Sequence, residues 1–510
     1  MPAGRASRTI KIASRSAAHE ATRSLRARLA RQQVPADGLR RQERARALRA
    51  MLEDLGPIYI KLGQILATRP DIMPQYLMDE FANLNDQARI EPFRVFEPVI
   101  EAEMGGHWRS RFQEINTERP LGAASVAQVY RGVWTDGRPC VLKVQRPGTS
   151  AAMLGDMAVL RRVAGLLHRA APHMCEVIDV KSMMDVVFTA MEAEVDFTRE
   201  ARNMKDARKA ARHFKQVKVP KVIEATPRVL VQTFVDGTPI NRVKDDQLSD
   251  KQRKKIAYQL MGFMFRGYFV DRAFHADPHP GNILIDQDGK AYVIDWGMYG
   301  KIDRNASLIL LKGLVGMARG DGAALARDWI KLGSLTPWSN STRFANDVSN
   351  TIPYWANATL EELNFGVALM SLARYSTERG IQVSPLVSLI GKSMGNIEGS
   401  VRSIYPRLKF DKALGMVMQD IARELLADSL GPENGMHMLL DSIYSFNNSS
   451  SQMQSVLGDM TTGQLGINVR TNQADPLGPR RGQRLKHHVS LGSTAAAAAA
   501  ETVVRRTLGG

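Results

Sequence analysis

Cysteine is almost absent from this chain of 510 residues, which contains only Cys140 and Cys175. Two thiols are too few for a disulfide framework or a thiolate metal site, and they favour a reducing, cytoplasmic setting. Long apolar runs are lacking as well. No stretch reaches the roughly 18 consecutive apolar residues of a membrane-spanning helix, and the N-terminal region has no apolar core of signal-peptide length. We therefore expect a protein that is not secreted and is soluble or peripheral to a membrane.

Acidic residues are scarce in the first fifty positions, where thirteen Lys or Arg face only Glu20, Asp37 and Glu43. Such a segment can be a solvated leader, can bind an anionic lipid surface, or can resemble the Arg- and Ser-rich transit peptides of organelles. It lacks interleaved aromatic residues and a recognisable nucleic-acid-binding module, so nucleic acid is not an expected partner. We expect a basic leader over residues 1–50, either disordered or lying as a helix on a membrane surface.

The remaining composition, 44% hydrophobic and 24% charged, is typical of a globular chain with more than one domain. Residue patterns after the leader predict a helical extension over 51–118, a strand-rich lobe with a helical insert over 119–236, and a mostly helical lobe over 237–467. The Gly-, Arg- and Ala-rich tail over 468–510 has no periodicity and is expected to be disordered. Strands followed by helices predict an α+β molecule with two lobes.

Apolar residues at helical spacing support the helical assignments. In the extension the stripe consists of Leu52, Leu55, Ile58, Leu62, Ile65 and Leu66. In the insert it consists of Met153, Leu154, Met157, Leu160 and Val163. Both stripes are expected to face a core.

Two β-hairpins are predicted from short apolar runs on either side of a turn. The first joins residues 126–133 to 140–144 through Asp136-Gly137, and the second covers residues 283–294.

The strongest chemical signal is the segment HADPHPGN at 275–282, which is followed by VIDWG at 293–297. Phosphotransfer sites use one carboxylate to orient or deprotonate the attacking hydroxyl, an Asn five residues later to hold metal, and a second Asp beyond a hairpin to complete the metal site. Asp277, Asn282 and Asp295 fit these three roles in order. Each piece alone is equally compatible with an ordinary surface loop, but the joint spacing favours phosphotransfer. The histidines in the loop, His275 and His279, are interpreted as structural.

A cation for nucleotide phosphates is also required, and Val141-Leu-Lys143-Val places Lys143 on a predicted strand. Most strand lysines are simply exposed, but this one comes after the strand entry and before the predicted catalytic loop. Its ion-pair partner should come from a helix. The segment from Glu194 to Asn203 offers Asp196, Glu200 and Asn203 on one face, although a solvated helix face would have the same pattern.

The loop expected to cover the phosphates departs from the three-glycine pattern of ordinary protein kinases. It consists of Gly122, Ala123, Ala124 and Ser125 and therefore has one glycine. Alanine restricts φ and adds a methyl group, so the approach of this loop to a nucleotide should differ.

Together these segments resemble the UbiB family, also called AarF or ADCK, of atypical kinase-like proteins. The family's Lys-x-Gly-Gln motif is similar to residues 61–64, its Glu-x-Asp motif to residues 194–196, and its Ala-rich loop to residues 122–125. The segments at 275–282 and 295–297 also resemble the family pattern. The first position of the Ala-rich loop differs, because Gly122 replaces alanine.

The resemblance implies a protein-kinase-like fold that binds ATP or ADP with Mg²⁺, and whose N-terminal extension covers the place where a peptide substrate would dock. It implies that Lys61 and Gln64 meet Glu194 and Asp196 near the nucleotide. It also implies that Lys143 pairs with Glu200, with Glu194 as a competing partner. The expected role is an atypical kinase or ATPase in isoprenoid-quinone or lipid metabolism at a membrane, with a biosynthetic protein complex among its expected partners.

Two other interpretations of the same residues remain. Small-molecule phosphotransferases of the aminoglycoside or choline kinase type resemble the segments at 275–282 and 295–297, but Lys61 and Gln64 argue against that class. A non-catalytic nucleotide-binding regulator would need Asp277, Asn282 and Asp295 equally, because they would still hold the metal and nucleotide.

Overall fold

The computed structural model describes residues 37–67, 73–84, 89–170, 180–318, 320–356 and 364–430. The chain divides into two compact units, residues 1–422 and 423–510. Of the second unit, the described ranges include only 423–430, the end of helix α16 (Phe410–Leu430). The leader as far as residue 36 and the tail expected at 468–510 lie outside the described residues.

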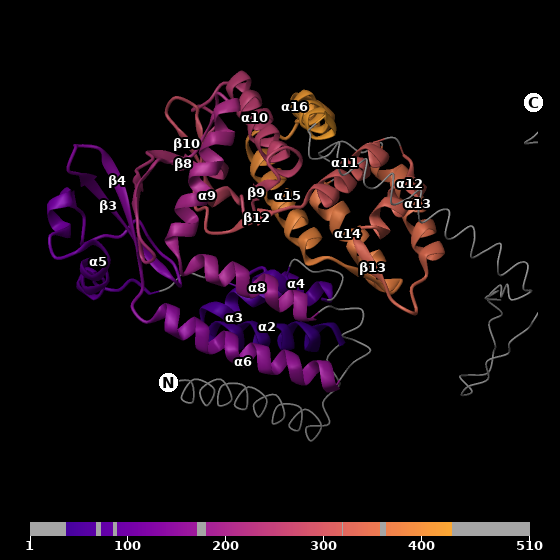
Figure 1. The fold of residues 1–510 in the computed structure, drawn as a ribbon, viewed down its shortest axis with the longest axis horizontal. Coiled ribbons are helices and arrows are strands. Elements are labelled where there is room, and N and C mark those ends of the chain that lie inside the picture. The colour runs from indigo at the N-terminus through magenta and orange to yellow at the C-terminus, as the bar shows by residue number, and fades with distance from the viewer. Residues whose placement is uncertain are drawn as a thin grey trace, which may run out of the picture. The chain divides into compact units, whose positions relative to one another are not determined.

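A layer of helices forms the N-terminal part of the fold, as the first apolar stripe predicts. Its members are α2 (Asp37–Leu55), α3 (Pro57–Leu66), α4 (Gln75–Phe81), α6 (Thr149–Ala170) and α8 (Val180–Glu194). Figure 1 shows these helices packed together, and Leu52 and Ile58 lie in their shared core. Gly56, at a φ of 109°, separates α2 from α3, because glycine tolerates that conformation. Pro57 follows at the first position of α3, where proline fits well.

The structure differs from the sequence-based expectation in two places within this layer. Helix α2 begins at Asp37, inside the expected leader, and Arg49 on it pairs with Glu80 of α4 at 2.8 Å. Residues 37–50 therefore belong to the folded layer. On α6, Leu154 and Val163 are 61% and 45% exposed. Both lie roughly 80–100° around the helix from its buried stripe, because each residue advances the helix by about 100°.

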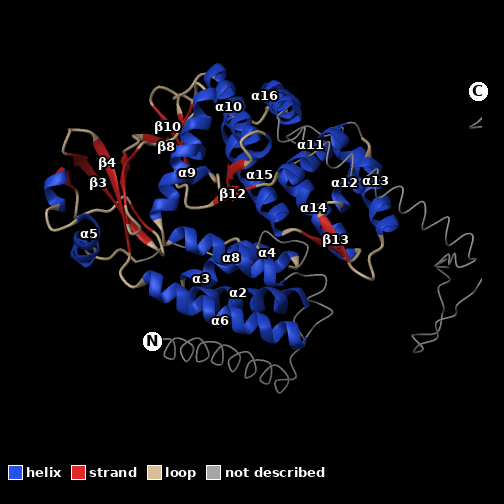
Figure 2. Cartoon of the chain, viewed as in Figure 1, coloured by secondary structure: helices blue, strands red, loops and turns tan. Residues whose placement is uncertain are grey.

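The next structural unit is a six-stranded antiparallel sheet with the order β1-β3-β4-β7-β6 and with β2 paired to β3. Figure 2 shows its strands β3 and β4 side by side. Its strands are β1 (Phe112–Ile115), β2 (Gly122–Ala123), β3 (Ala127–Trp134), β4 (Pro139–Gln145), β6 (Val222–Ala225) and β7 (Val229–Thr233). Pairing of Gly132 with Cys140 confirms the first predicted hairpin. Cys140 is buried, and burial raises the pKa of its thiol to about 11, so this residue is an unreactive core thiol. Cys175 lies outside the described residues.

Residues 93–111 pack on this sheet and residues 112–115 form its strand β1, although the helical extension was expected to continue to residue 118. They form η1 (Phe93–Val95), α5 (Glu97–Met104), η2 (Trp108–Arg111) and strand β1. The ring of Phe93 meets buried Tyr130 of β3 edge-on at 4.8 Å between centroids. Aromatic residues in short, irregular turns have no helical or strand period, so the sequence pattern does not show that they share a core with β3.

Short strands and two helices form the next part of the chain. Helix α9 (Phe197–Ala210) and η3 (Ala211–His213) lead to β5 (Val217–Lys218), and β8 (Gly237–Pro239), η4 (Ile240–Arg242) and α10 (Asp250–Phe269) come after the first sheet. They are followed by β9 (Ala273–His275), η5 (Pro280–Asn282), β10 (Ile283–Asp286), β11 (Ala291–Val293) and β12 (Tyr299–Lys301). Pairing of Ile283 with Val293 confirms the second predicted hairpin. Strands β5, β11, β10 and β8 form one sheet, and β9 pairs with β12.

The remaining described helices follow this second group of strands along the chain, and the combination of helices with mostly antiparallel sheets confirms the α+β class. They are α11 (Arg304–Ala318), α12 (Gly322–Ile330), α13 (Ser341–Ala356), α14 (Phe365–Glu378) and α15 (Pro385–Ile404), with a ribbon of β13 (Gly333–Leu335) and β14 (Ile381–Val383). Helices α14 and α15 approach closely at Gly366, where an added Cβ would lie 2.5 Å from the backbone nitrogen of Gly395. Within the described ranges, no helix combines the length and apolar character needed to cross a bilayer.

Glu398 of α15 is buried at the N-terminus of α14, where the backbone nitrogens of Phe365 and Gly366 donate to its two carboxylate oxygens. Burial outweighs these hydrogen bonds and raises the pKa of Glu398 to about 8. An unfolded glutamate has a pKa of about 4.3. Between these values the folded state retains a proton that the unfolded state has lost. The contribution of Glu398 to stability is therefore fully present below about pH 4.3 and is lost as the pH rises through about 8.

We expect Glu398→Gln to remove this pH dependence, because the amide stays neutral throughout. Between pH 5 and pH 8, the free energy of unfolding of the wild type should fall relative to that of the variant by something on the order of 3 kcal/mol. Urea denaturation of both proteins at the two pH values measures the difference. Glu378→Gln, at an exposed position on α14, is the control. Parallel pH profiles for wild type and Glu398→Gln would contradict the prediction.

Candidate active site

The segment 275–282 forms a loop between β9 and β10 that is held by its first histidine. The imidazole of His275 is buried, its Nδ1 accepts a hydrogen bond from the backbone nitrogen of Asp277 at 3.0 Å, and its Nε2 donates to the carbonyl of Ile294 at 3.1 Å. Burial lowers the pKa of His275, so the ring is neutral and can accept and donate in this way. The structural interpretation of His275 agrees with this geometry.

His279 closes the same loop at its other end. Its Nδ1 accepts a hydrogen bond from the backbone nitrogen of Gly281 at 3.0 Å, at the start of the short turn η5. Asn282 ends that turn, and its side-chain nitrogen donates to the carbonyl of Asp277 at 3.1 Å. The hydrogen bond therefore holds the side chain of Asn282 against the backbone of Asp277. Because the side-chain nitrogen of Asn282 is used in this bond, its amide oxygen is the atom that can bind a metal.

Asp295 follows β11 and has a φ of 57°, a left-handed conformation that costs a non-glycine residue free energy. The following residue, Trp296, is buried, and its Nε1 donates to the carbonyl of Val293 at 3.0 Å. The burial of this indole helps to hold the strained turn. The side chain of Asp295 is 52% exposed, and Nζ of Lys143 lies 3.1 Å from its Oδ1. Lys143 lowers the pKa of Asp295 well below its ordinary value, so the carboxylate is ionised.

Lys143 on β4 joins the sheet to helix α9. Its Nζ lies 2.9 Å and 3.0 Å from the two carboxylate oxygens of Glu200, as predicted, and the ammonium lies 5.2 Å from the centroid of the Phe197 ring. Burial opposes the charged lysine, but Asp295 and Glu200 outweigh it and raise the pKa of Lys143. Lys143, Glu200 and Asp295, all predicted from the sequence as site residues, therefore form one ionic cluster.

Most of the predicted site residues line a single cavity of about 390 Å³. They are Lys61, Gln64, Ala124, Ser125, Lys143, Glu194, Glu200, Asp277, Asn282 and Asp295. Gly122, Ala123 and Asp196 are not among its lining residues. Residues far apart in the sequence thus supply carboxylates, side-chain amides and lysines to one space, which is the composition that a metal–nucleotide site needs.

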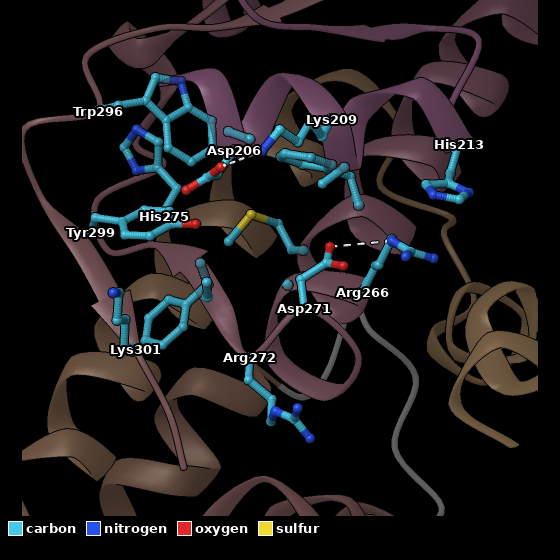
Figure 3. A pocket seen from close by; sticks show the side chains of 17 residues that line it. Asp206, Lys209, His213, Arg266, Asp271, Arg272, His275, Trp296, Tyr299 and Lys301 are labelled. Carbon is cyan, nitrogen blue, oxygen red and sulfur yellow. Dashed lines mark hydrogen bonds and ion pairs between the residues drawn. The ribbon is translucent and has the colours of Figure 1, made fainter. Parts of the chain in front are cut away.

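A second cavity, of about 490 Å³, is lined in part by His275 and Trp296 (Figure 3). Its charged walls include two internal ion pairs, Asp206 with Lys209 at 3.0 Å and Asp271 with Arg266 at 3.2 Å. None of Asp277, Asn282 and Asp295 lines it. The residues predicted to perform chemistry therefore point to the smaller cavity as the candidate active site.

Comparison with known proteins identifies the family of the chain. Residues 83–328 match the ABC1 atypical kinase-like domain. A probable protein kinase UbiB of Cellvibrio japonicus is 31% identical over 376 residues, an alignment that covers 72% of this chain and 67% of the relative. The chain belongs to the UbiB/AarF/ADCK family. This membership confirms the kinase-like character of the α+β fold.

Another member of the UbiB family, an uncharacterized aarF domain-containing protein kinase of Arabidopsis thaliana described as chloroplastic, is 33% identical over 391 residues. That alignment covers 76% of this chain and 54% of the Arabidopsis protein, so this chain spans about half of that relative. Among solved structures, the Rv3197–erythromycin complex of Mycobacterium tuberculosis has a TM-score of 0.48 at 22% identity, over 71% of this chain and 96% of that chain.

The Lys-x-Gly-Gln motif of the UbiB family lies on α3, and its lysine reaches the predicted acidic motif. Nζ of Lys61 is 2.6 Å from Oε1 of Glu194 at the end of α8. Burial opposes the charge on Lys61, but Glu194, Asp277 and Asp295 outweigh it and raise the pKa of the lysine. Helix α3 therefore contributes a positive charge to the cavity.

Gln64 and Asp196, the other two residues of the predicted contact between the motifs, have different partners in the structure. Gln64 donates to the carbonyl of Leu84 at 3.2 Å, after α4, and Asp196 caps helix α9 by accepting from the backbone nitrogen of Thr198 at 3.0 Å. An aspartate immediately before a helix commonly accepts a hydrogen bond from its first turn. Asp196 thus has a local structural role, while Gln64 still lines the cavity next to Lys61.

The Ala-rich loop of the UbiB family begins as strand β2 and ends as a tight turn. Gly122 and Ala123 pair with Val129 and Gln128 of β3, and the backbone nitrogen of Ala124 donates to the carbonyl of Ala127 at 2.8 Å. Because Gly122 and Ala123 are used in strand pairing, only Ala124 and Ser125 of the predicted loop reach the cavity.

The oxygen atoms of the site fit a magnesium ion better than a softer metal. Asn282 offers an amide oxygen and Asp295 a carboxylate, and both residues line the cavity. Across the described ranges, no cluster of three or more His, Cys, Asp or Glu side chains could hold a metal by itself. Mg²⁺ commonly binds one or two protein carboxylates and takes its other ligands from substrate phosphates and water. The two protein ligands present are therefore sufficient for that mode of binding.

Two functional residues were missed by the sequence analysis, Lys392 and Asn396 of helix α15. Both line the cavity and contact the carboxylate of Asp277. They lie four residues apart, and the same helix also carries Ser393 and Ser400, which are buried. A row of polar residues at helical spacing along a helix with a buried apolar face was the available signal.

We expect Lys61→Met to change nucleotide turnover at least fivefold without preventing folding, because the cation faces the cavity while the apolar stripe of α3 supplies the packing. The matched control is Arg49→Met, which removes an ion pair between α2 and α4 outside the cavity. Turnover and thermal unfolding should be measured for both variants. Equal turnover in Lys61→Met, Arg49→Met and the wild type would show that Lys61 has no part in the site.

Proposed function

We propose that this member of the UbiB family is an atypical kinase-like ATPase or phosphotransferase that binds ATP or ADP with Mg²⁺. The observation that carries the proposal is the convergence of Lys143, Asp277, Asn282 and Asp295 on one cavity. These are the types of side chain that position nucleotide phosphates, hold the metal and orient the attacking oxygen in phosphotransfer.

Each side chain has a distinct task in this proposal. Lys143, held by Glu200, binds the phosphates, and Asn282 and Asp295 hold Mg²⁺, which when bound neutralises phosphate charge. Asp277 accepts a hydrogen bond from the attacking hydroxyl and takes its proton. Burial would raise the pKa of Asp277, but Lys392 and Lys61 outweigh burial and lower it. The carboxylate is therefore ionised at neutral pH and acts mainly by orienting the hydroxyl.

The phosphoryl acceptor in this proposal is water or a small molecule. Lys61 and Gln64 of α3 line the same cavity as Asp277, so this helix occupies space next to the attacking group. A folded protein substrate would have to displace α3, whose Ile58 and Tyr59 are buried in the core of the helical layer. Isoprenoid-quinone or lipid metabolism is the proposed setting, in line with the UbiB name of the relatives.

The decisive experiment measures Mg²⁺-dependent binding of ADP by calorimetry and phosphate release from ATP, using purified full-length protein with and without vesicles. Micromolar binding that disappears with EDTA, together with phosphate release or transfer, is expected. Binding without any turnover would support the nucleotide-binding regulator instead. Absence of binding in the presence of Mg²⁺ would refute the proposed function.

The basic leader is proposed to hold the protein reversibly at an anionic membrane surface. Residues 1–36 carry eight Lys or Arg and one acidic residue, Glu20. Each basic side chain near such a surface contributes on the order of 1 kcal/mol. Deleting residues 2–36 is expected to abolish most co-sedimentation with phosphatidylserine vesicles in low salt while preserving nucleotide affinity. The cut ends before Asp37, because α2 belongs to the fold. Unchanged sedimentation of the shortened protein would place membrane attachment elsewhere.

A further inference from the structure

Both carboxylate oxygens of Asp277 are engaged by one helix, α15. The side-chain nitrogen of Asn396 donates to Oδ1 at 2.6 Å, and Nζ of Lys392 lies 3.1 Å from Oδ2. The side chains of Lys392 and Asp277 are 15% and 22% exposed, so the ion pair is largely shielded from water. An acceptor hydroxyl that approaches Asp277 therefore meets a carboxylate whose two oxygens each already accept one hydrogen bond.

The ion pair is not needed to hold α15 against the loop, because two buried serines already do so. Oγ of Ser393 donates to the carbonyl of His275 at 2.6 Å, and Oγ of Ser400 donates to the carbonyl of Pro278 at 3.0 Å. These bonds attach the helix to the loop backbone on both sides of Asp277. Lys392 therefore projects into the cavity from a position that does not depend on its own contact with Asp277.

The loop itself provides no strong cation beside Asp277. The loop over 275–282 contains no Lys or Arg, and Nδ1 of His279 accepts a hydrogen bond from the backbone nitrogen of Gly281. Of the other lysines that line the cavity, Lys143 is paired with Glu200 and Asp295, and Lys61 is paired with Glu194. A phosphoryl group in transfer spreads negative charge over three oxygens and needs cations on more than one side. Lys392 is the lysine in direct contact with Asp277.

We propose that Lys392 is a catalytic residue, which leaves Asp277 when the nucleotide binds and contacts the phosphoryl group during its transfer. Asn396 is a positioning residue that retains its hydrogen bond to Oδ1 of Asp277. The movement of Lys392 frees Oδ2 for the acceptor hydroxyl. This inference rests on the proposed phosphotransfer function and adds to it the residue that stabilises the transferred group.

The chemical step is a balanced displacement. The acceptor oxygen forms a bond to the terminal phosphorus of ATP, while the bond from that phosphorus to the bridging oxygen breaks and its electron pair leaves with ADP. The proton of the acceptor hydroxyl moves to Oδ2 of Asp277. Lys392 compensates charge on the phosphoryl oxygens throughout and exchanges no proton.

The test uses full-length protein and compares Mg²⁺–ADP affinity with and without fluoroaluminate, which imitates the phosphoryl group in transfer. Lys392→Met should keep Mg²⁺–ADP affinity within about twofold of the wild-type value. The factor by which fluoroaluminate tightens ADP binding should be at least about tenfold smaller in this variant than in the wild type. Its kcat should be about 100-fold lower, with little change in KM. Lys392→Arg should recover part of kcat, because it restores the charge. Lys312→Met, at an exposed position on α11, is the control and should match the wild type.

Thermal unfolding of each variant accompanies these measurements. If Lys392→Met does not fold, Lys392→Arg and Asn396→Ala carry the test. Asn396→Ala should lower kcat but keep the fluoroaluminate effect, because its role is confined to Asp277. Full fluoroaluminate tightening in a folded Lys392→Met protein would overturn the role of Lys392 while the proposed function stands. If wild-type protein does not bind Mg²⁺–ADP at all, the proposed function is wrong and this inference is wrong with it.

Discussion

Replacement of Asp295 by asparagine is expected to weaken Mg²⁺–nucleotide binding at least about 100-fold while the protein remains folded. Of the two proposed metal ligands, Asn282 and Asp295, only Asp295 is a carboxylate. Its replacement weakens the binding of Mg²⁺, which leaves the phosphate charge poorly neutralised. The backbone should tolerate the change, because asparagine is one of the few residues that readily adopt the positive φ found at this position. Glu200 still pairs with Lys143 in the variant.

Calorimetric titration of ADP at several Mg²⁺ concentrations measures this effect. Asp288→Asn is a matched control, since Asp288 is exposed in the turn between β10 and β11. The control should bind as the wild type does. If Asp295→Asn binds nucleotide with wild-type affinity and the same dependence on Mg²⁺, Asp295 is not a metal ligand and the proposed site is wrong.

Replacement of Asp277 by asparagine should give the opposite pattern, with nucleotide binding retained and turnover lowered by about 10² to 10⁴. The amide cannot take a proton from the acceptor, whereas Asn282 and Asp295 still hold the metal. In the variant, the side-chain nitrogen of Asn396 can still donate to the amide oxygen of the new asparagine at position 277 when that oxygen takes the place of Oδ1. Lys392 loses an anionic partner, so a moderate decrease in thermal stability accompanies the change.

Binding and single-turnover measurements on the same preparation separate these effects. An affinity loss in Asp277→Asn equal to that in Asp295→Asn would assign Asp277 to the metal. Unchanged turnover would remove its role in orienting the acceptor. The two aspartate variants together therefore distinguish a phosphotransfer site from a site that only binds nucleotide.

The hairpins, the loop at 275–282 and the pair Lys143–Glu200 could be predicted from sequence because each depends on local patterns or on a fixed order of motifs. Asp136-Gly137 marks a turn wherever two apolar runs flank it. The spacing of Asp277, Asn282 and Asp295 is set by a single loop and hairpin, so short-range sequence is sufficient to relate them. Glu200 lies on the predicted helix face, and its distance to Lys143 agrees with that prediction.

Other details could not be predicted because they depend on which surfaces meet. Gln64 has the same residue type and helix position whether it contacts Asp196 or the carbonyl of Leu84, and only the packing of α3 on α4 selects the second. The packing of residues 37–50 in the helical layer includes the ion pair of Arg49 with Glu80, and helix α3 lies between these two residues in the sequence. A basic residue in a basic segment does not reveal such a partner.

The amino-acid sequence by itself determined the family, the α+β class and the three residues proposed to hold metal and orient the acceptor. All of these follow from residue types at short, fixed separations. Only the tertiary structure decided that α15 approaches the loop, because that contact joins residues more than a hundred positions apart. Ser393 and Ser400 attach the helix to the backbone of the loop, and in this arrangement Lys392 and Asn396 contact Asp277.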